Sequence, residues 1–143
     1  MHALRPQALE EGDFWYALKD LVKTTTVGTT LKTTFEAKGK VPVLPQACQE
    51  NLLRIGQEAL SNTLKYARAR SFGTRLVCNP KEIRLELRDD GDGFQFKERH
   101  DGAGLTGMRE RAAEMGGELR IVSSRGKGMT ITAILSLDKE SAS

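Results

Sequence analysis

The feature that most limits the possible folds is a pair of strand patterns that follow each other directly. Residues 71–78 and 81–88 are both strand-like, and only the turn Asn79-Pro80 separates them. A second pair, 118–123 and 129–137, flanks the turn formed by residues 124–128. Because these strands succeed each other without a crossover helix, the pattern disfavours a doubly wound architecture.

Three helical patterns complete the chain. They cover residues 13–26, 47–67 and 105–115, and a Thr- and Val-rich strand pattern, 27–37, lies between the first two. Asp13 is a candidate N-cap, and Gly116-Gly117 ends the last helix. The apolar positions expected on one face of each helix are, in chain order, Phe14, Leu18, Leu21 and Val22; Leu53, Leu60, Leu64 and Ala67; and Met108, Ala112 and Met115. The order of elements predicts an α+β fold, a two-layer sandwich in which helices cover one face of a mixed sheet.

The composition suits a soluble globular domain. Of the 143 residues, 38% are hydrophobic and 29% charged. No apolar stretch approaches the roughly 20 residues of a membrane helix, so we expect a cytoplasmic location. The net charge of +3 is too small to indicate nucleic-acid binding by itself. Five basic residues and no acid lie between Lys65 and Lys81, which fits either a solvated face or a positive field beside an anionic ligand.

The sequence RDDGDGF, residues 88–94, places three carboxylates and two glycines directly after a strand. Three interpretations compete: a tight turn, a calcium loop, or the rim of a pocket that binds a ligand. A calcium loop of the EF-hand type needs an oxygen ligand at its third position, where Gly91 stands if the loop begins at Asp89. The spacing therefore disfavours calcium.

A second glycine series, Gly102-Ala103-Gly104-Leu105-Thr106-Gly107, leads into the helix at 105–115. Free backbone N–H groups and the helix dipole favour anions at such a position, and missing Cβ atoms allow close approach of a phosphate. A helix entry that needs a flexible backbone has the same pattern. The series fits neither the P-loop nor the dinucleotide-binding fingerprint.

The long helix carries polar residues along one stripe. Glu58, Asn62, Lys65 and Tyr66 recur at helical spacing. A solvated helix face with one half-buried tyrosine is one explanation. A magnesium triphosphate site is the other, because it needs oxygen ligands for a hard cation, a positive charge for phosphate and a flat ring near a base.

Together these segments resemble the catalytic ATP-binding (HATPase) domain of sensor histidine kinases. The matching boxes are QEALSNTLKYA (57–67), DDGDGF (89–94), GAGLTGMRERAAEMGG (102–117) and SSRGKGMT (123–130). The third box resembles the subfamily that pairs with NarL/LuxR-type helix-turn-helix response regulators. The resemblance implies the Bergerat ATP-binding sandwich that gyrase, Hsp-type chaperones and mismatch-repair ATPases share, with ATP and Mg²⁺ as cofactors.

The resemblance also implies roles for individual residues. Asp89 corresponds to the aspartate that accepts a hydrogen bond from the adenine amine, and Asn62 to the asparagine that binds magnesium. The implied catalytic residues are Glu58, Asn62 and Lys65, and the implied metal ligands are Asn62 and Glu58. The implied nucleotide-binding residues are Asn62, Lys65, Tyr66, Asp89, Gly91, Gly93, Gly102, Gly104, Leu105, Gly107, Met108 and Thr130. Residues 95–103 correspond to the ATP lid. Relatives often have Gly-Thr after the final glycine pair, whereas here Met129 precedes Thr130.

The implied activity is transfer of the γ-phosphoryl group of ATP to a histidine on a separate dimerisation domain, which then phosphorylates a response regulator. Residues 13–138 would form the catalytic domain, 1–12 the joint to that absent dimerisation and phosphoacceptor hairpin, and 139–143 a disordered tail. Neither His2 nor His100 lies in the helical context of a phosphoacceptor histidine, so we expect that the chain does not phosphorylate itself. We also expect it to be mostly monomeric and to bind no nucleic acid directly. An anti-sigma-type serine kinase and a non-catalytic nucleotide-binding module of the same fold are the alternatives.

Overall fold

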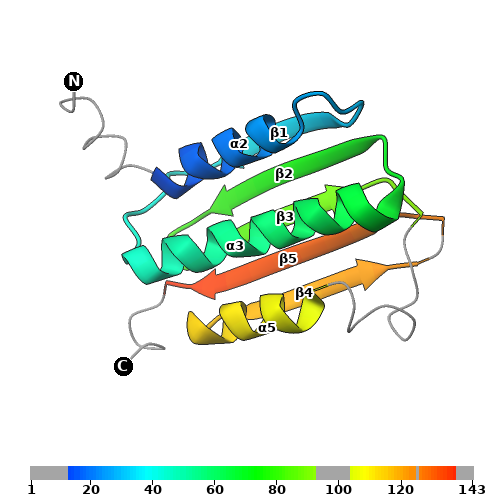
Figure 1. The fold of residues 1–143 in the computed structure, drawn as a ribbon. Coiled ribbons are helices and arrows are strands. Elements are labelled where there is room, and N and C mark those ends of the chain that lie inside the picture. The colour runs from blue at the N-terminus through cyan, green and yellow to red at the C-terminus, as the bar shows by residue number, and fades with distance from the viewer. Residues whose placement is uncertain (1–12, 93–103, 125, 138–143) are drawn as a thin grey trace, which may run out of the picture.

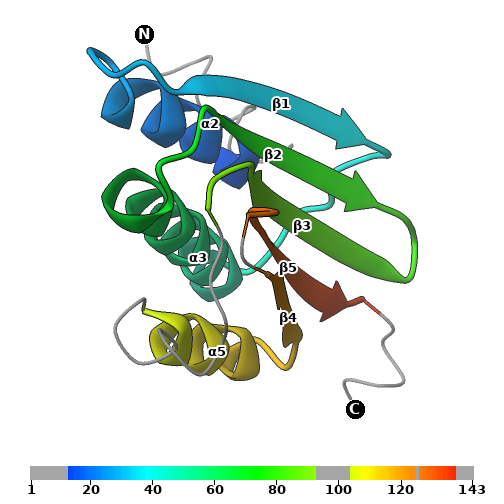
Figure 2. The same cartoon turned by 90° about the vertical axis from the view of Figure 1, so that its right-hand side faces the viewer.

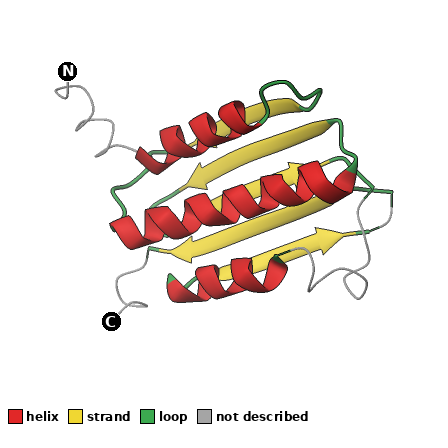
Figure 3. Cartoon of the chain, viewed as in Figure 1, coloured by secondary structure: helices red, strands yellow, loops and turns green. Residues whose placement is uncertain are grey.

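A computed structural model describes residues 13–92, 104–124 and 126–137 of the chain. Its helices are α2 (Asp13–Thr25), α3 (Gln46–Asn62) and α5 (Leu105–Glu114), and a π-helical turn, η2 (Thr63–Ala67), follows α3 directly. Its strands are β1 (Lys32–Lys38), β2 (Ser71–Cys78), β3 (Glu82–Asp89), β4 (Glu118–Ser123) and β5 (Met129–Ser136). Figure 3 distinguishes helices from strands. Within the described ranges, no helix has both the length and the apolarity that a membrane span requires.

The strands form one mixed sheet in the order β1-β2-β3-β5-β4. β1 and β2 are parallel, and each other neighbouring pair is antiparallel. Figures 1 and 2 show that α2, α3 and α5 lie on the same face of this sheet, with α3 in the middle. The predicted α+β two-layer sandwich is therefore confirmed.

Burial alternates along the two central strands. In β3, Ile83, Leu85 and Leu87 are buried, whereas the residues between them are exposed or half-buried. The buried residues of β2 follow the same alternation: Phe72, Thr74, Leu76 and Cys78. Side chains of a strand point to opposite faces in turn, so the buried set lies under the helices. The same alternation carries Asp89, the last residue of β3, onto this face, where it is buried.

The apolar face of α3 differs from the prediction at its C-terminal end. Leu60 is buried, but Leu64 is 40% exposed. A π-helical turn is wider than an α-helical one, so the 3.6-residue period that would place Leu64 above Leu60 is lost after Asn62. The prediction that Leu64 lies in the core is wrong, and Thr63 faces the interior instead.

The strand predicted at 27–37 begins only at Lys32. The hydroxyl of Thr26 donates to the carbonyl oxygen of Val22 at 2.8 Å. The hydroxyl of Thr29 donates to the carbonyl oxygen of Thr26, also at 2.8 Å. Threonine hydroxyls that bond to nearby backbone groups compete with the hydrogen bonds of a sheet. The first part of the threonine-rich run therefore forms turns after α2 rather than strand.

One polar group in the core generates a stability prediction. Thr74 is 2% exposed, and among the described residues its hydroxyl has no hydrogen-bond partner. Burying an unpaired hydroxyl is unfavourable, so Thr74→Val should raise the free energy of unfolding by about 1 kcal/mol. Urea denaturation measures the change. Thr132→Val, which alters the same atoms on the opposite, half-buried face of the sheet, should change it by less than about 0.5 kcal/mol. A Thr74→Val variant less stable than the native chain would show that the hydroxyl has a partner.

Candidate functional site

Two segments of the chain end and two others begin at the same edge of the sheet, at the right of Figure 1. There the C-terminal ends of α3 and β3 meet the first residues of β5 and α5. Thr63, after α3, bonds to Asp89 at the end of β3, and Asp89 pairs in register with Met129 at the start of β5. Gly104, before α5, packs against Glu58 on α3. Residues far apart in the sequence therefore form one site.

Asp89 is the buried carboxylate of this site, with only 5% of its surface exposed. Its Oδ1 accepts a hydrogen bond from the backbone N–H of Gly91 at 2.9 Å, and its Oδ2 accepts one from the hydroxyl of Thr63 at 3.1 Å. The backbone N–H of Met129 also donates to the carboxylate. A carboxylate has roughly four lone-pair positions. The three described donors therefore leave Asp89 able to accept a further hydrogen bond.

The environment of Asp89 favours the protonated form. Burial is the largest effect and raises the pKa of the carboxyl above its ordinary value. The hydrogen bonds from Gly91 and Thr63 act in the opposite direction, and the negative charge of Asp90 raises the pKa further. The net result is a raised pKa, so Asp89 holds its proton more strongly than an exposed aspartate.

The turn before β5 packs closely on the turn after β3. Gly128 has a φ of +77°, and a Cβ atom there would collide with the backbone carbonyl oxygen of Asp89. The backbone N–H of Gly126 donates to the carbonyl oxygen of Asp92. A residue with a side chain at position 128 would be strained in conformation and would also separate these two turns.

The other two carboxylates of the turn are exposed, but each has a structural contact. Oδ1 of Asp90 accepts hydrogen bonds from the backbone N–H groups of Arg70 at 2.8 Å and Ser71 at 2.9 Å, and these bonds lower the pKa of Asp90. Nε of Arg68 donates to Oδ2 of Asp92 at 2.8 Å. The three carboxylates thus differ: Asp89 faces inward, and the other two attach the turn to the segment before β2.

The polar stripe predicted on the long helix is not uniform. Asn62 is buried, whereas Glu58 and Lys65 are exposed. Asn62 ends α3 and Lys65 lies within η2. An amide and a carboxylate one helical turn apart supply oxygen ligands of the kind that Mg²⁺ prefers. That they hold a metal stays a prediction.

The entry to α5 lies against the side chain of Glu58. Gly104 has a φ of +72°, and a Cβ atom there would overlap Oε2 of Glu58. Leu105 and Met108 are fully buried, so they support the site from within the core. A Cβ atom at Gly107 would meet no atom of the described residues within 4 Å, so as far as those residues go the backbone is open on that side.

Thr130 lies on the opposite face of the sheet from Asp89. It pairs with Arg88 and Val122, residues of the uncovered face, whereas its neighbour Met129 pairs with Asp89. The structure therefore does not bring the Thr130 side chain to Asp89. Met129, which is 6% exposed, takes the position beside the carboxylate.

Several predicted site residues lie outside the described part of the chain. Gly93, Gly102 and the lid segment 95–103 fall there, as do His2 and His100. Tyr66 belongs to η2, but its side chain also lies outside the description.

Sequence reasoning missed two residues that contact Asp89. Met129 could have been found from alternation, because Ile131 and Ala133 are buried and residue 129 shares their face. Thr63 could also have been found, because it lies four residues after Ala59 and eight after Ile55, which are both buried, and so shares their face of the helix.

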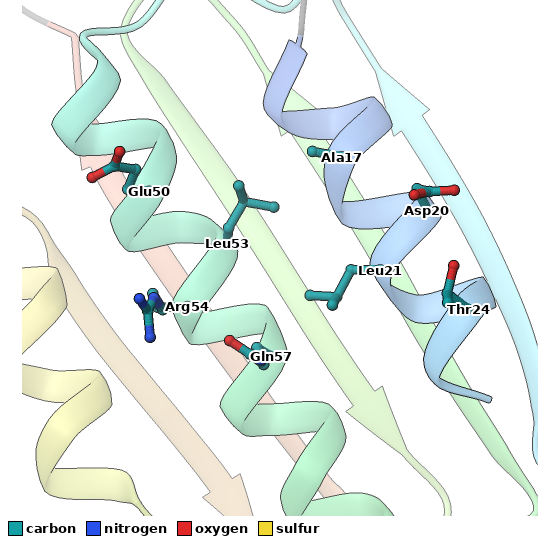
Figure 4. A pocket seen from close by; sticks show the side chains of 8 residues that line it. All are labelled: Ala17, Asp20, Leu21, Thr24, Glu50, Leu53, Arg54 and Gln57. Carbon is teal, nitrogen blue, oxygen red and sulfur yellow. The ribbon is translucent and has the colours of Figure 1, made fainter.

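A separate groove of about 750 Å³ runs between α2 and α3, away from these residues (Figure 4). Leu21 and Leu53 lie in it, together with Asp20, Glu50 and Arg54. The groove lies on the α2 side of α3, whereas Glu58 of α3 contacts the entry to α5. It does not form part of the site around Asp89.

Comparisons with known proteins agree with this arrangement. The model of the family described as histidine kinase-, DNA gyrase B- and HSP90-like ATPases matches residues 48–139. The sensor histidine kinase LnrJ of Bacillus subtilis is 35% identical over 121 residues, which are 85% of this chain and 30% of that protein. The sensor protein VraS of Staphylococcus epidermidis is 33% identical over 138 residues, 96% of this chain and 39% of that protein. The chain thus spans well under half the length of these curated relatives.

The blue-light activated histidine kinase of Erythrobacter litoralis shares the fold, with a TM-score of 0.72 and 17% identity. The superposition covers 94% of this chain and 44% of that one. The matched family segment contains Asn62 at the end of α3, Asp89 at the end of β3 and Gly104 before α5. The chain belongs to the family of histidine kinase-, DNA gyrase B- and HSP90-like ATPases.

Proposed function

We propose that this chain is the Mg-ATP-binding catalytic domain of a sensor histidine kinase. The observation that carries the proposal is Asp89, a buried carboxylate held by three described donors with capacity to accept one more. A buried acceptor of this kind selects a ligand that brings a hydrogen-bond donor. The exocyclic amine of adenine is such a donor, whereas guanine has a carbonyl oxygen at the same ring position.

The rest of the edge suits the phosphate groups. The first N–H groups of α5 and the open backbone at Gly107 favour an anion, and the exposed ammonium of Lys65 adds positive charge. Asn62 and Glu58 would hold Mg²⁺, which when bound neutralises charge on the phosphates. Gly91 lets the backbone pass close to the base, and Leu105 and Met108 pack beneath the site.

In the parent protein, the domain formed by residues 13–138 would position ATP for in-line transfer to a histidine of a separate dimerisation domain. Residues 1–12 would be the joint to that domain, and 139–143 a tail. The box GLTGMRERAAEMGG supports a response regulator of the NarL/LuxR type as the next acceptor. We further propose that the domain is cytoplasmic and mostly monomeric, contacts no nucleic acid directly, and does not phosphorylate itself.

The first prediction concerns nucleotide selectivity. In calorimetric titrations with Mg²⁺, the native chain should bind ATP and show no binding of GTP. Asp89→Asn should weaken ATP binding by about 10- to 100-fold, the effect of losing a hydrogen bond to a charged acceptor. Asp92→Asn is a matched control in the same turn and should stay within about twofold, because its ion pair is exposed. Equal binding of ATP and GTP would contradict the adenine-reading role of Asp89.

The second prediction concerns stability and pH. The pKa of Asp89 is higher in the folded chain than in the unfolded chain, where it is about 4. Protonation of Asp89 therefore stabilises the fold fully at pH values below about 4, and this stabilisation is lost as the pH rises through the pKa of the folded chain. Asparagine keeps two of the three contacts, because its oxygen can accept from Gly91 and its amide can donate to the Thr63 hydroxyl, which also reaches the Ala59 carbonyl at 3.0 Å.

Asp89→Asn should therefore be at least as stable as the native chain at pH 7. Its advantage should shrink as the pH falls toward about 4. Thermal unfolding of both chains at several pH values measures this difference. A native chain that is more stable than the variant at pH 7 would show that ionised Asp89 stabilises the fold.

The third prediction concerns phosphoryl transfer. When the chain is mixed with labelled ATP, Mg²⁺ and a separately produced dimerisation domain of the same parent protein, the label should appear on that domain and not on this chain. The product should be acid-labile and base-stable, as phosphohistidine is, whereas phosphoserine would survive acid. Asn62→Ala should slow the transfer. An acid-stable product would instead identify a serine kinase.

A further inference from the structure

Thr63 is the residue of the site whose role is unassigned. It is 3% exposed, it begins η2, and it directly follows Asn62. Its hydroxyl oxygen lies 3.1 Å from Oδ2 of Asp89 and 3.0 Å from the carbonyl oxygen of Ala59. The hydroxyl has one proton, so at any moment it donates to one of these two acceptors.

The two acceptors depend on the hydroxyl to different degrees. The carbonyl oxygen of Ala59 already accepts the backbone N–H of Thr63 within the helix. When Asp89 is ionised, its Oδ2 shares a negative charge in a buried position, where a donor has its largest effect. The hydroxyl proton is therefore more stabilising on Asp89 when that carboxyl is ionised.

The hydroxyl also fixes the direction of the carboxylate. Gly91 donates to Oδ1 and Thr63 to Oδ2, so the two oxygens are held by donors from two different segments. Gly91 belongs to the turn after β3 itself, whereas Thr63 reaches Asp89 from the end of α3. Without Thr63, the one described side-chain hydrogen bond to Asp89 would be lost, leaving only backbone N–H groups of the surrounding turns.

We propose that Thr63 is a positioning residue for adenine recognition: its hydroxyl holds the Asp89 carboxylate in the orientation that accepts the adenine amine. This inference rests on the proposed function. It extends adenine recognition to the helix turn that also carries Asn62, the proposed metal ligand. In this proposal the same turn, at Asn62 and Thr63, therefore helps to position both the base and the metal.

The same hydrogen bond affects how Asp89 titrates. Burial and the charge of Asp90 raise the pKa of Asp89, and the Thr63 hydroxyl lowers it. Among the described residues, Asp90 is the charged group that acts on this carboxyl. Its neighbours in the sheet are uncharged: Phe72 of β2 and the backbone of Met129 of β5. The ammonium group of Lys65, in η2, is exposed. Removing the hydroxyl should raise the pKa of Asp89 further, so that the carboxyl becomes protonated at a higher pH.

The test compares Thr63→Val, which keeps the branched shape without the hydroxyl, with Thr63→Ser, which keeps the hydroxyl. Calorimetric titration with ATP and Mg²⁺ should show Thr63→Val binding about 3- to 10-fold more weakly than the native chain at neutral pH. Thr63→Ser should bind within about twofold. The dissociation constant of Thr63→Val, divided by that of the native chain, should grow as the pH falls, because Asp89 should become protonated at a higher pH in the variant. Protonation of the nucleotide affects both constants equally and cancels in this ratio.

A double-mutant cycle separates positioning from a general structural effect. In an Asp89→Asn chain, adding Thr63→Val should cause no further loss of affinity. An equal loss in both backgrounds would overturn the positioning role, as would a Thr63→Val variant that binds ATP as the native chain does at every pH. A carbon NMR titration of the Asp89 carboxyl without nucleotide should show a higher midpoint in Thr63→Val, and an unchanged midpoint would also overturn the role. If the native chain itself does not bind ATP, the proposed function fails, and this is visible before any variant is compared.

Discussion

The candidate site depends on the burial of one carboxylate, Asp89. The strand alternation that buries Ile83, Leu85 and Leu87 also places Asp89 under the helices. An ionised carboxylate in such a place is unfavourable unless donors surround it. Here the donors come from three segments: the turn after β3, the turn after α3 and the first residue of β5. Each of these three segments, which converge at this edge, thus supplies one donor to this group.

The turn around Asp89 is held from outside by its neighbours. Asp90 accepts two backbone N–H groups from the segment before β2, and Asp92 pairs with Arg68. The exposed ion pair contributes little stability by itself, but the two backbone hydrogen bonds set the direction of the turn. A dense cluster of acidic residues thus divides into one inward carboxylate for a ligand and two that shape the chain around it. Function and local structure use the same short sequence.

Much of the fold was predictable because its signals are local. The hairpin at 71–88 follows from alternation and from Asn79, whose Oδ1 accepts the N–H groups of Lys81 at 2.8 Å and Glu82 at 2.9 Å. The end of α5 also follows from the sequence, since Gly116 has a φ of +74° there. These elements need no knowledge of distant contacts.

The remaining features depend on geometry that residue patterns do not encode. The π-helical turn that begins at Thr63 changes the helical period, so Leu64 is exposed. The hydrogen bond from Thr63 to Asp89 joins residues that are 26 apart in the sequence. Pairing of Asp89 with Met129 decides that Thr130 lies on the other face of the sheet. A shift of one residue in a strand exchanges its faces. Motif matching alone cannot detect such a shift.

The most direct test of the account is an NMR titration of the amide signals with Mg-ADP. A nucleotide bound at Asp89 should change most strongly the backbone amide signals of Gly91, Thr63 and Met129, which surround that carboxylate. The amide signals of Leu21 and Leu53, in the groove between α2 and α3, should change little. Large changes in that groove with constant signals at Gly91 and Met129 would contradict the account, because the nucleotide would then bind on the other side of α3.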